Sequence, residues 1–429
     1  MRPGRLTMVA ISLCTLLMLQ LSACIGSTST SGSTPTASAP VTLTYWYTEG
    51  ISETSLILSQ IQAFEQQNPN IKISAQLVPY GEAQARFATA AQAGKAPDVL
   101  RSDVDWATQF ASLRYLLPID QYVSQSDLSD YLAFALNYDR YNGHLYGLPQ
   151  VTNFLALMYN KSKLAKAGIT SPPTTMDQLE ADAIKVAQTK AAKYGFETSG
   201  ASYFALPFLW AFGGGMIDTD GKTILVNNAG SVAGLTFLLK LQNQDKVMPT
   251  KVDFNNGYLN MTTDFKDGTT AMIFQGPWEA ANILTGSAFV SNKSNLGIAG
   301  IPTGPGAATG SPTGGQTYVI YAGTQHPAEA YKFISFMSST SSQVAIAKAN
   351  HTLPTRQSAY QDSAVSADPV TSGYYAVKDV ARNRPIIPQG GQLFTDFDPN
   401  VQAALAGAKT PQQALDAVAA AWQKLLSGG

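Results

Sequence analysis

The chain has 429 residues, of which 45% are hydrophobic and 13% are charged, and its formal net charge is −1. This length allows a large buried core and favours more than one lobe. The sequence has no basic stripe and no long run of like charges, so we expect no nucleic-acid partner.

The N-terminal region predicts export and lipid attachment. Arg2 and Arg5 precede an apolar stretch from Leu6 to Leu21, which is typical of a secretory signal. The segment "LSAC" that follows resembles the bacterial lipobox, whose cysteine carries a diacylglycerol after cleavage. We therefore predict a signal peptide over 1–23, a lipid on Cys24, and a flexible tether over 24–40 that is rich in Ser, Thr, Gly, Ala and Pro. The only other cysteine, Cys14, lies inside the signal, so the mature chain has no internal disulfide and no thiolate metal site.

Beyond the tether, strands and helices alternate. We predict strands at 41–47 ("VTLTYWY"), 71–78 ("IKISAQLV") and 97–100 ("PDVL"), with helices over 52–67 and 81–93 between them. This βαβαβ order predicts a parallel sheet covered by helices on both faces. Ligands of such sheets bind beyond the carboxyl ends of the strands.

A second block begins near residue 145, where the apolar run 154–159 leads into a helix that Gly168 ends. The later pattern predicts helices over 176–193, 232–241, 327–337 and 411–426, strands at 269–278 and 317–323, and a loop or crossover over 300–316. Gly276 and Pro277 interrupt the first of these two strands.

Several stretches occur in the order seen in one known family: "LTYWYTEG", "AGKAPDVLRSDVDWATQFA", "YGLPQVTNFLALMYNKSKLAKAGI", "FKDGTTAMIFQGPWEA", "TGGQTYVI", "HPAEAYKFISFM" and "LPTRQSAY". Together they resemble the extracellular solute-binding proteins of ABC importers, in the branch that includes maltose-binding protein, over residues 41 to about 426.

This resemblance implies an α/β, two-lobed, type II periplasmic-binding-protein fold. Each lobe would be a mainly parallel sheet flanked by helices and would be discontinuous in sequence, with lobe 1 at 41–149 plus 313–340 and lobe 2 at 150–312 plus 341–429. The lobes would close over a sugar or oligosaccharide and present it to the permease. The protein would be a monomer on the outer face of the cytoplasmic membrane, held by Cys24.

A sugar site needs aromatic rings for the apolar sugar faces and polar side chains for the hydroxyls. Trp46, Tyr47 and Glu49 end the first strand, and Asp103 lies at a position where sugar-binding relatives place a carboxylate. Asp105 is a second possibility, or the start of a helix. The remaining expected ligand residues are Asn153, Trp210, Trp278, Gly314, Gly315, Gln316 and Arg356. Tyr203, seven residues before Trp210, could flank the same cleft, although core packing suits one of the two better. The resemblance supports Asn153 and Arg356, whereas Gln316 stands where many relatives carry an aromatic residue.

The sequence contains no G-x-S-x-G, H-E-x-x-H or Walker A motif, and we expect neither enzymatic activity nor a cofactor. Two alternatives remain at this point. One keeps the fold but binds a polyamine, a glycerophosphoester, a peptide or another small polar solute. The other is an anchored carbohydrate-active enzyme that uses paired carboxylates such as Glu49 and Asp103.

Overall fold

The structure is a computed structural model that describes residues 40–48 and 51–428, with side chains described from residue 54 in the second range. Residues from Pro40 onward form one compact unit. The predicted signal peptide, Cys24 and nearly all of the tether lie outside the described residues, as does Glu49.

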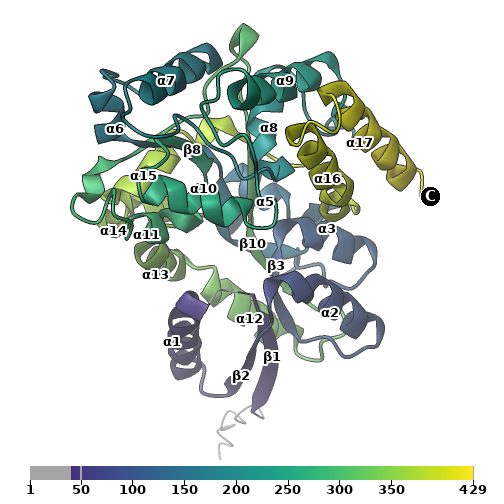
Figure 1. Ribbon diagram of the computed structural model, residues 1–429. Helices are drawn as coiled ribbons and strands as arrows, with labels where there is room; N and C mark the ends of the chain where they lie inside the picture. The colour runs from purple at the N-terminus through teal and green to yellow at the C-terminus, as the bar shows by residue number, and fades with distance from the viewer. Residues whose placement is uncertain (1–39, 49–50, 429) are drawn as a thin grey trace, which may run out of the picture. The chain divides into compact units, whose positions relative to one another are not determined.

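Within the described residues, one mixed sheet of seven strands runs through this body (Figure 1). Its strands lie in the order β11 (Leu353–Pro354), β6 (Gly147–Phe154), β10 (Ser311–Ile320), β3 (Val99–Asp103), β1 (Val41–Tyr47) and β2 (Ile71–Leu77), with β12 (Ala381–Arg382) beside β10. The strand β1 is parallel to β2 and β3, as the alternating pattern predicts, while β10 is antiparallel to both β3 and β6.

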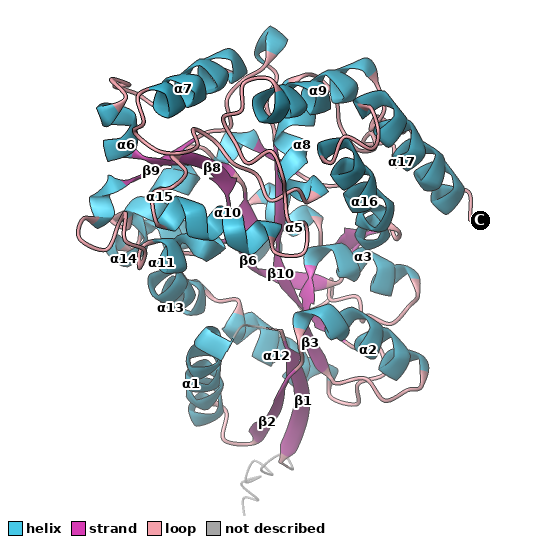
Figure 2. Cartoon of the chain, in the orientation of Figure 1, coloured by secondary structure: helices cyan, strands magenta, loops and turns pink. Residues whose placement is uncertain are grey.

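Helices cover both faces of the parallel part of this sheet (Figure 2). The helices α1 (Ile51–Gln67) and α12 (Pro327–Met337) pack on one face, where Phe64 and Phe333 meet Tyr45 in a buried cluster. The helices α2 (Tyr80–Gln92) and α3 (Val104–Ser112) pack on the other face against Leu100 and Val319. Neighbouring strand residues thus enter opposite cores, as the two-residue period of a strand requires.

Short elements connect this region to the rest of the body. They are α4 (Gln125–Leu128), α5 (Ala133–Asn137) and the hairpin β4 (Arg140–Tyr141) and β5 (His144–Leu145). After the hairpin, β6 enters the large sheet, and β7 (Ala156–Asn160) follows after a single residue. The chain therefore passes directly from one sheet to the next.

The second sheet has three strands within the described residues, in the order β8 (Met272–Gln275), β7 and β9 (Leu296–Ala299). Because β7 is antiparallel to both neighbours, the expectation of a mainly parallel sheet in the second lobe is wrong, although the α/β class is confirmed. Several helices separate β7 from β8, and their path returns the chain to the end of the sheet at which β7 leaves it. Alternation of strands and helices in the sequence does not reveal such a return.

The remaining helices all follow β7 in the chain. They are α6 (Lys161–Lys166), α7 (Met176–Gln188), α8 (Ser202–Ala211), α9 (Ala229–Asn243), α10 (Gly257–Lys266), α11 (Ala280–Ile283), α13 (Thr340–Asn350), α14 (Ser363–Ser366), α15 (Pro369–Ala376), α16 (Leu393–Leu405) and α17 (Pro411–Leu426). The helix α17 begins where the sequence predicts, because Thr410 and Gln413 form a capping box around the first turn, which Pro411 opens.

The buried apolar residues fall into separate clusters. One cluster begins at Phe154 and extends to Trp422, and it contains the cores of both the second sheet and α16–α17. The two smaller clusters use residues 43–148 and 318–337. The strands β6 and β10 carry the chain between these regions, so we propose that the clusters mark the two lobes at the boundaries given above.

Candidate binding site

A cavity of about 880 Å³ lies where the two sheets meet. Three of its residues follow the parallel strands in turn, because Thr48 comes after β1, Tyr80 after β2 and Asp103 ends β3. The site therefore lies beyond the carboxyl ends of these strands, as expected for an open α/β sheet. Its other lining residues are Arg101, Val151, Thr152, Asn153, Tyr203, Tyr258, Pro277, Trp278, Gly314, Gly315, Gln316, Thr352 and Arg384.

Asp103 is held from two sides. Its Oδ1 atom accepts a hydrogen bond of 3.0 Å from the backbone N–H of Asp105 and so caps α3. Its Oδ2 atom accepts a bond of 2.9 Å from the hydroxyl group of Tyr80. Although Tyr80 is 51% exposed, desolvation of its hydroxyl group, followed by the charge of Asp103, raises its pKa above the ordinary value, so Tyr80 remains a donor. The carboxylate is thus fixed at the cavity wall, with acceptor capacity left for a ligand.

Arg384 enters the same wall from the segment between β12 and α16. Its guanidinium group forms an ion pair with Asp105 and lies 3.9 Å from Asp103 Oδ1. Its Nε atom donates to the carbonyl oxygen of Thr313 at 2.8 Å, and its charged centre lies 5.6 Å from the ring of Tyr203. The cation is almost fully buried, and these contacts fix its orientation beside Asp103.

An aromatic wall faces these charged groups. Trp278 follows β8 on the short 3₁₀ turn Pro277–Glu279, and its indole Nε1 donates to the hydroxyl group of Tyr258 at 2.7 Å. The indole lies over Gly276, where an added Cβ would be 1.7 Å from a ring carbon. The break that Gly276 and Pro277 make in the strand therefore turns the indole toward the cavity, and the structure places Trp278 where the sequence predicts it.

Asn153, Gly314 and Gln316 line the cavity along the paired strands β6 and β10. Gly315 has a φ of +143°, and an added Cβ would lie 2.2 Å from the carbonyl oxygen of Val151. Only glycine fits at position 315, because the backbone has a positive φ there and the two strands pair closely. The Gln316 side chain accepts a hydrogen bond of 3.1 Å from Arg101, a lining residue that the sequence analysis missed.

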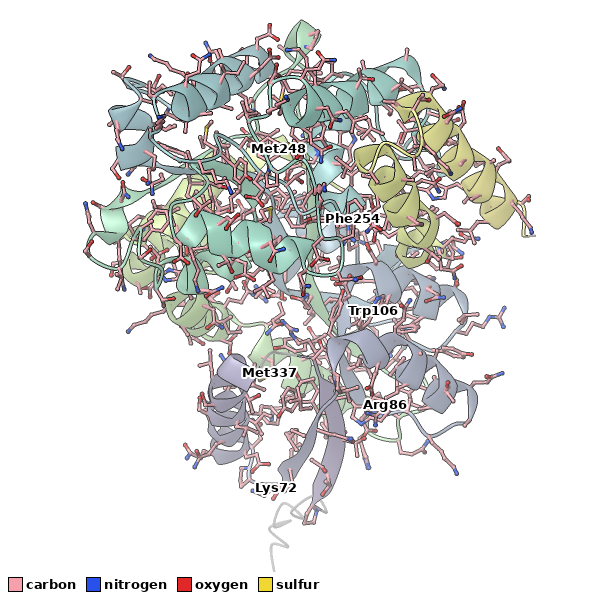
Figure 3. The ribbon with its side chains drawn as sticks, viewed as in Figure 1. Lys72, Arg86, Trp106, Met248, Phe254 and Met337 are labelled. Carbon is pink, nitrogen blue, oxygen red and sulfur yellow. The ribbon has the colours of Figure 1, made fainter. Side chains whose placement is uncertain are left out.

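Three predicted aromatic residues lie away from the cavity. Tyr47 is buried in the first core and stacks on Tyr45, and Trp210 packs on the second core from α8. Trp46 is half-buried beside α2, with the guanidinium carbon of Arg86 (labelled in Figure 3) 5.2 Å from its ring centre. Since apolar burial accounts for all three, we do not include them in the proposed ligand site.

Arg356 also lies outside the cavity. Its guanidinium group pairs with Asp127 at 2.9 Å and with Asp130 at 3.2 Å, and it stacks over Tyr131 at 4.1 Å. Its Nε atom donates to the carbonyl oxygen of Ser338. These partners use the donors that a ligand would need, so we propose that Arg356 has a structural role instead of the expected ligand contact.

Four charged or aromatic lining residues were missed by the sequence analysis, namely Tyr80, Arg101, Tyr258 and Arg384, as were the lining threonines Thr48, Thr152 and Thr352. The strand-end rule could have indicated Tyr80, which directly follows β2 and Pro79. Nothing local identifies Tyr258 or Arg384, because tertiary contacts alone bring them to the cavity. Tyr203, weighed together with Trp210, is the member of that pair that reaches the cavity, and its hydroxyl group donates to the carbonyl oxygen of Pro312 at 2.9 Å.

Among the described residues, no group of three or more His, Cys, Asp or Glu side chains is arranged to hold a metal ion. No helix in that part of the chain has the length and apolar character needed to cross a membrane.

The fold and the cavity define a two-sheet α/β ligand-binding protein with a site between its sheets. The chain belongs to the bacterial extracellular solute-binding proteins, whose family model matches residues 49–344, and within them to the family 1 proteins of ABC importers.

Individual relatives agree with this assignment. The maltotriose-binding protein of Pyrococcus abyssi is 24% identical over 356 residues, covering 81% of this chain and 74% of its own. The GacH receptor of Streptomyces glaucescens, solved unliganded and with acarbose, is 32% identical with a TM-score of 0.82, covering 90% of this chain and 99% of its own. The maltose-bound MalE3 of T. maritima is 26% identical with a TM-score of 0.79, and the match covers 90% of this chain and 100% of MalE3. The type II periplasmic-binding fold is thereby confirmed.

Proposed function

We propose that this protein binds a sugar or oligosaccharide in the cavity and delivers it to the permease of an ABC importer. The observation that carries the proposal is the placement of the Trp278 indole and the Asp103 carboxylate on the same 880 Å³ cavity. An aromatic face suits the C–H groups of a sugar ring, and a fixed carboxylate accepts hydrogen bonds from adjacent hydroxyl groups. The relatives described as binding maltotriose, maltose and acarbose support this ligand class.

The charges around the cavity favour a neutral ligand over the alternatives. Its described lining contains two guanidinium groups, from Arg101 and Arg384, and one carboxylate, from Asp103. A polyamine would require a surplus of carboxylates rather than of cations. A phosphoester would compete with Asp105, which already neutralises Arg384.

Hydrolysis by paired carboxylates requires two carboxyl groups on opposite sides of the bond. Asp103 is the single acidic residue among the described lining residues, and Glu49, its partner in that alternative, lies outside the described residues. The family consists of binding proteins. We therefore propose binding without turnover.

The proposed anchor supplies the cellular setting. A lipid on Cys24, reached by a tether of small residues, would hold the body beside a membrane-embedded permease on the outer face of the cytoplasmic membrane. We propose that the protein acts in this role as a monomer.

Isothermal titration of the purified protein with maltotriose, acarbose and spermidine tests the proposal. We expect saturable one-to-one binding of at least one of the two sugars, no binding of spermidine, and no release of reducing ends on prolonged incubation. Binding of spermidine alone would move the ligand to another class. Release of reducing ends would show that the protein is an enzyme.

A further inference from the structure

We propose that Tyr258 is a positioning residue, which holds the Trp278 indole in the orientation that stacks on a sugar ring. This inference rests on the proposed function and adds the part of the site that prepares the aromatic wall before a ligand arrives. The Tyr258 hydroxyl group is the central member of a chain of hydrogen bonds that runs from the Trp278 indole to Glu279.

The chain has a fixed direction. The indole Nε1 of Trp278 can only donate, and it lies 2.7 Å from the hydroxyl oxygen of Tyr258. The Tyr258 hydroxyl group must therefore give its own proton to another acceptor, which is Glu279 Oε1 at 2.7 Å. The second oxygen of Glu279 accepts a bond of 2.9 Å from the Asn282 amide. Because one end is a pure donor and Glu279 is an acceptor, the order of the bonds cannot reverse.

Tyr258 is itself held in place. Its ring lies 5.8 Å from the ring of Phe204, and α10 fixes its backbone. Burial, followed by the nearby charge of Glu279, raises the pKa of Tyr258 well above its ordinary value. The hydroxyl group therefore keeps its proton at neutral pH and continues to donate to Glu279.

The indole is then restrained on two sides. Gly276 lies under one face of the ring, as the 1.7 Å approach of an added Cβ shows, and Tyr258 holds the N–H edge. The torsion between Cβ and the ring of a tryptophan has broad minima, so an indole without its edge contact samples several orientations. Binding would then have to fix this torsion at an entropic cost, which the hydrogen bond removes in advance.

A direct contact between Tyr258 and the ligand is the competing explanation, because Tyr258 also lines the cavity and is 37% exposed. A double-mutant cycle separates the two roles, since phenylalanine at position 278 keeps an aromatic face but has no N–H group to orient. A positioning role requires Trp278 Nε1, whereas a direct contact does not.

The test titrates maltotriose and acarbose into the wild type, Tyr258→Phe, Trp278→Phe and the double variant. We expect Tyr258→Phe to weaken binding about tenfold in the wild type, as for one lost hydrogen bond, and by less than about twofold in the Trp278→Phe background. Tyr122→Phe is the matched control, because Tyr122 stacks on Tyr331 in the first region, is not among the lining residues, and should leave affinity unchanged. Equal weakening in both backgrounds, or none in either, would overturn the positioning role.

A second measurement needs no ligand. The chain has five tryptophans, so a ¹⁵N spectrum should show five indole N–H signals, with that of Trp278 assigned by its loss in Trp278→Phe. Tyr258→Phe should shift this signal and leave the other four in place. An unshifted signal would disprove the hydrogen bond, whatever the protein binds. If the wild type bound neither sugar, the proposed function would fail and the role of Tyr258 in sugar binding with it, while the indole shift would still report the hydrogen bond.

Discussion

The guanidinium group of Arg384 forms a buried ion pair with the carboxylate of Asp105, on the wall of the cavity and behind Asp103. Burial raises the pKa of Asp105 to about 7 against the opposing effect of Arg384. The other carboxylate oxygen of Asp105 has no hydrogen-bond partner within the described residues. The pair thus joins the segment after β12 to the first turn of α3, at a position where either partner alone would be a buried, uncompensated charge.

Replacing Arg384 by methionine should therefore destabilise the protein. We expect the free energy of unfolding at pH 8, measured by urea denaturation, to fall by about 3 kcal/mol. The loss should be smaller at pH 5, because the raised pKa of Asp105 leaves this carboxyl group largely protonated there and its cation is no longer needed. Adding Asp105→Asn should recover part of the loss, and Arg86→Met, at an exposed ion pair with Glu82, should change stability by less than about 0.5 kcal/mol. A full loss in the Asp105→Asn background would contradict the pairing.

Removing the indole tests the aromatic wall directly. Trp278→Ala should weaken maltotriose binding by about 2 kcal/mol, which corresponds to roughly thirtyfold, because truncated aromatic anchors cost this much in binding sites. Calorimetry gives the affinity, and the urea midpoint shows whether the fold survives. Trp210→Phe serves as the control, since Trp210 packs on the second core outside the cavity. Unchanged affinity in Trp278→Ala would remove this residue from the site.

A substitution at Arg356 should lower the stability of the protein and leave its sugar affinity unchanged. Arg356→Met leaves Asp127 and Asp130 without their cation, and because both carboxylates are partly exposed we expect a loss of stability of about 1–2 kcal/mol. Sugar affinity should stay within about twofold, because Arg356 does not line the cavity. A large loss of affinity without a loss of stability would restore the ligand role that the resemblance implied.

The sequence predicted the parts of the site that depend on local pattern. Asp103 at the end of the third strand follows from the alternation of strands and helices, and the turn at Gly276 and Pro277 indicated that Trp278 leaves its strand. These features depend only on residues that are close together in the chain, so they can be predicted from a single sequence. The strand-end rule failed at the first strand, because Trp46 and Tyr47 lie away from the cavity.

The sequence could not predict the partners of the charged residues. Arg356 and Arg384 both lie in the C-terminal part of the chain. The pattern of residues around each arginine does not show whether its side chain contacts solvent, a ligand or a carboxylate. Folding places the first beside Asp127 and Asp130 and the second beside Asp105. Similarly, the antiparallel second sheet depends on how the helices between β7 and β8 return the chain, which no local periodicity records.

The predicted anchor has its own test. Cys24→Ser should move the protein from the membrane fraction to the medium or periplasm, because the two acyl chains that would hold it stably in the bilayer are then absent. Fractionation followed by immunoblotting measures this shift, with Cys14→Ser as the matched control that keeps the predicted lipid site. Recovery of Cys24→Ser with membranes after a carbonate wash would contradict lipid attachment.

A buried carboxylate in the first region predicts an unusual pH dependence of stability. Asp139 is 1% exposed, and neither of its carboxylate oxygens has a hydrogen-bond partner of good geometry within the described residues. Burial raises its pKa to about 7. In the unfolded chain the same group titrates near its ordinary value, so between about pH 4 and pH 7 the folded state binds more protons than the unfolded state.

The contribution of Asp139 to stability is therefore greatest at low pH and is lost as the pH rises through 7. Asp139→Asn, which stays neutral, should raise the free energy of unfolding by about 2 kcal/mol at pH 8 and change it little at pH 4. Urea denaturation from pH 4 to pH 8 measures the difference between variant and wild type, and this difference removes the effects of all other titrating groups. Asp120→Asn is the control, because Asp120 is exposed beside His144. A difference that shrinks with rising pH would show that the Asp139 carboxylate is stabilised in its charged form.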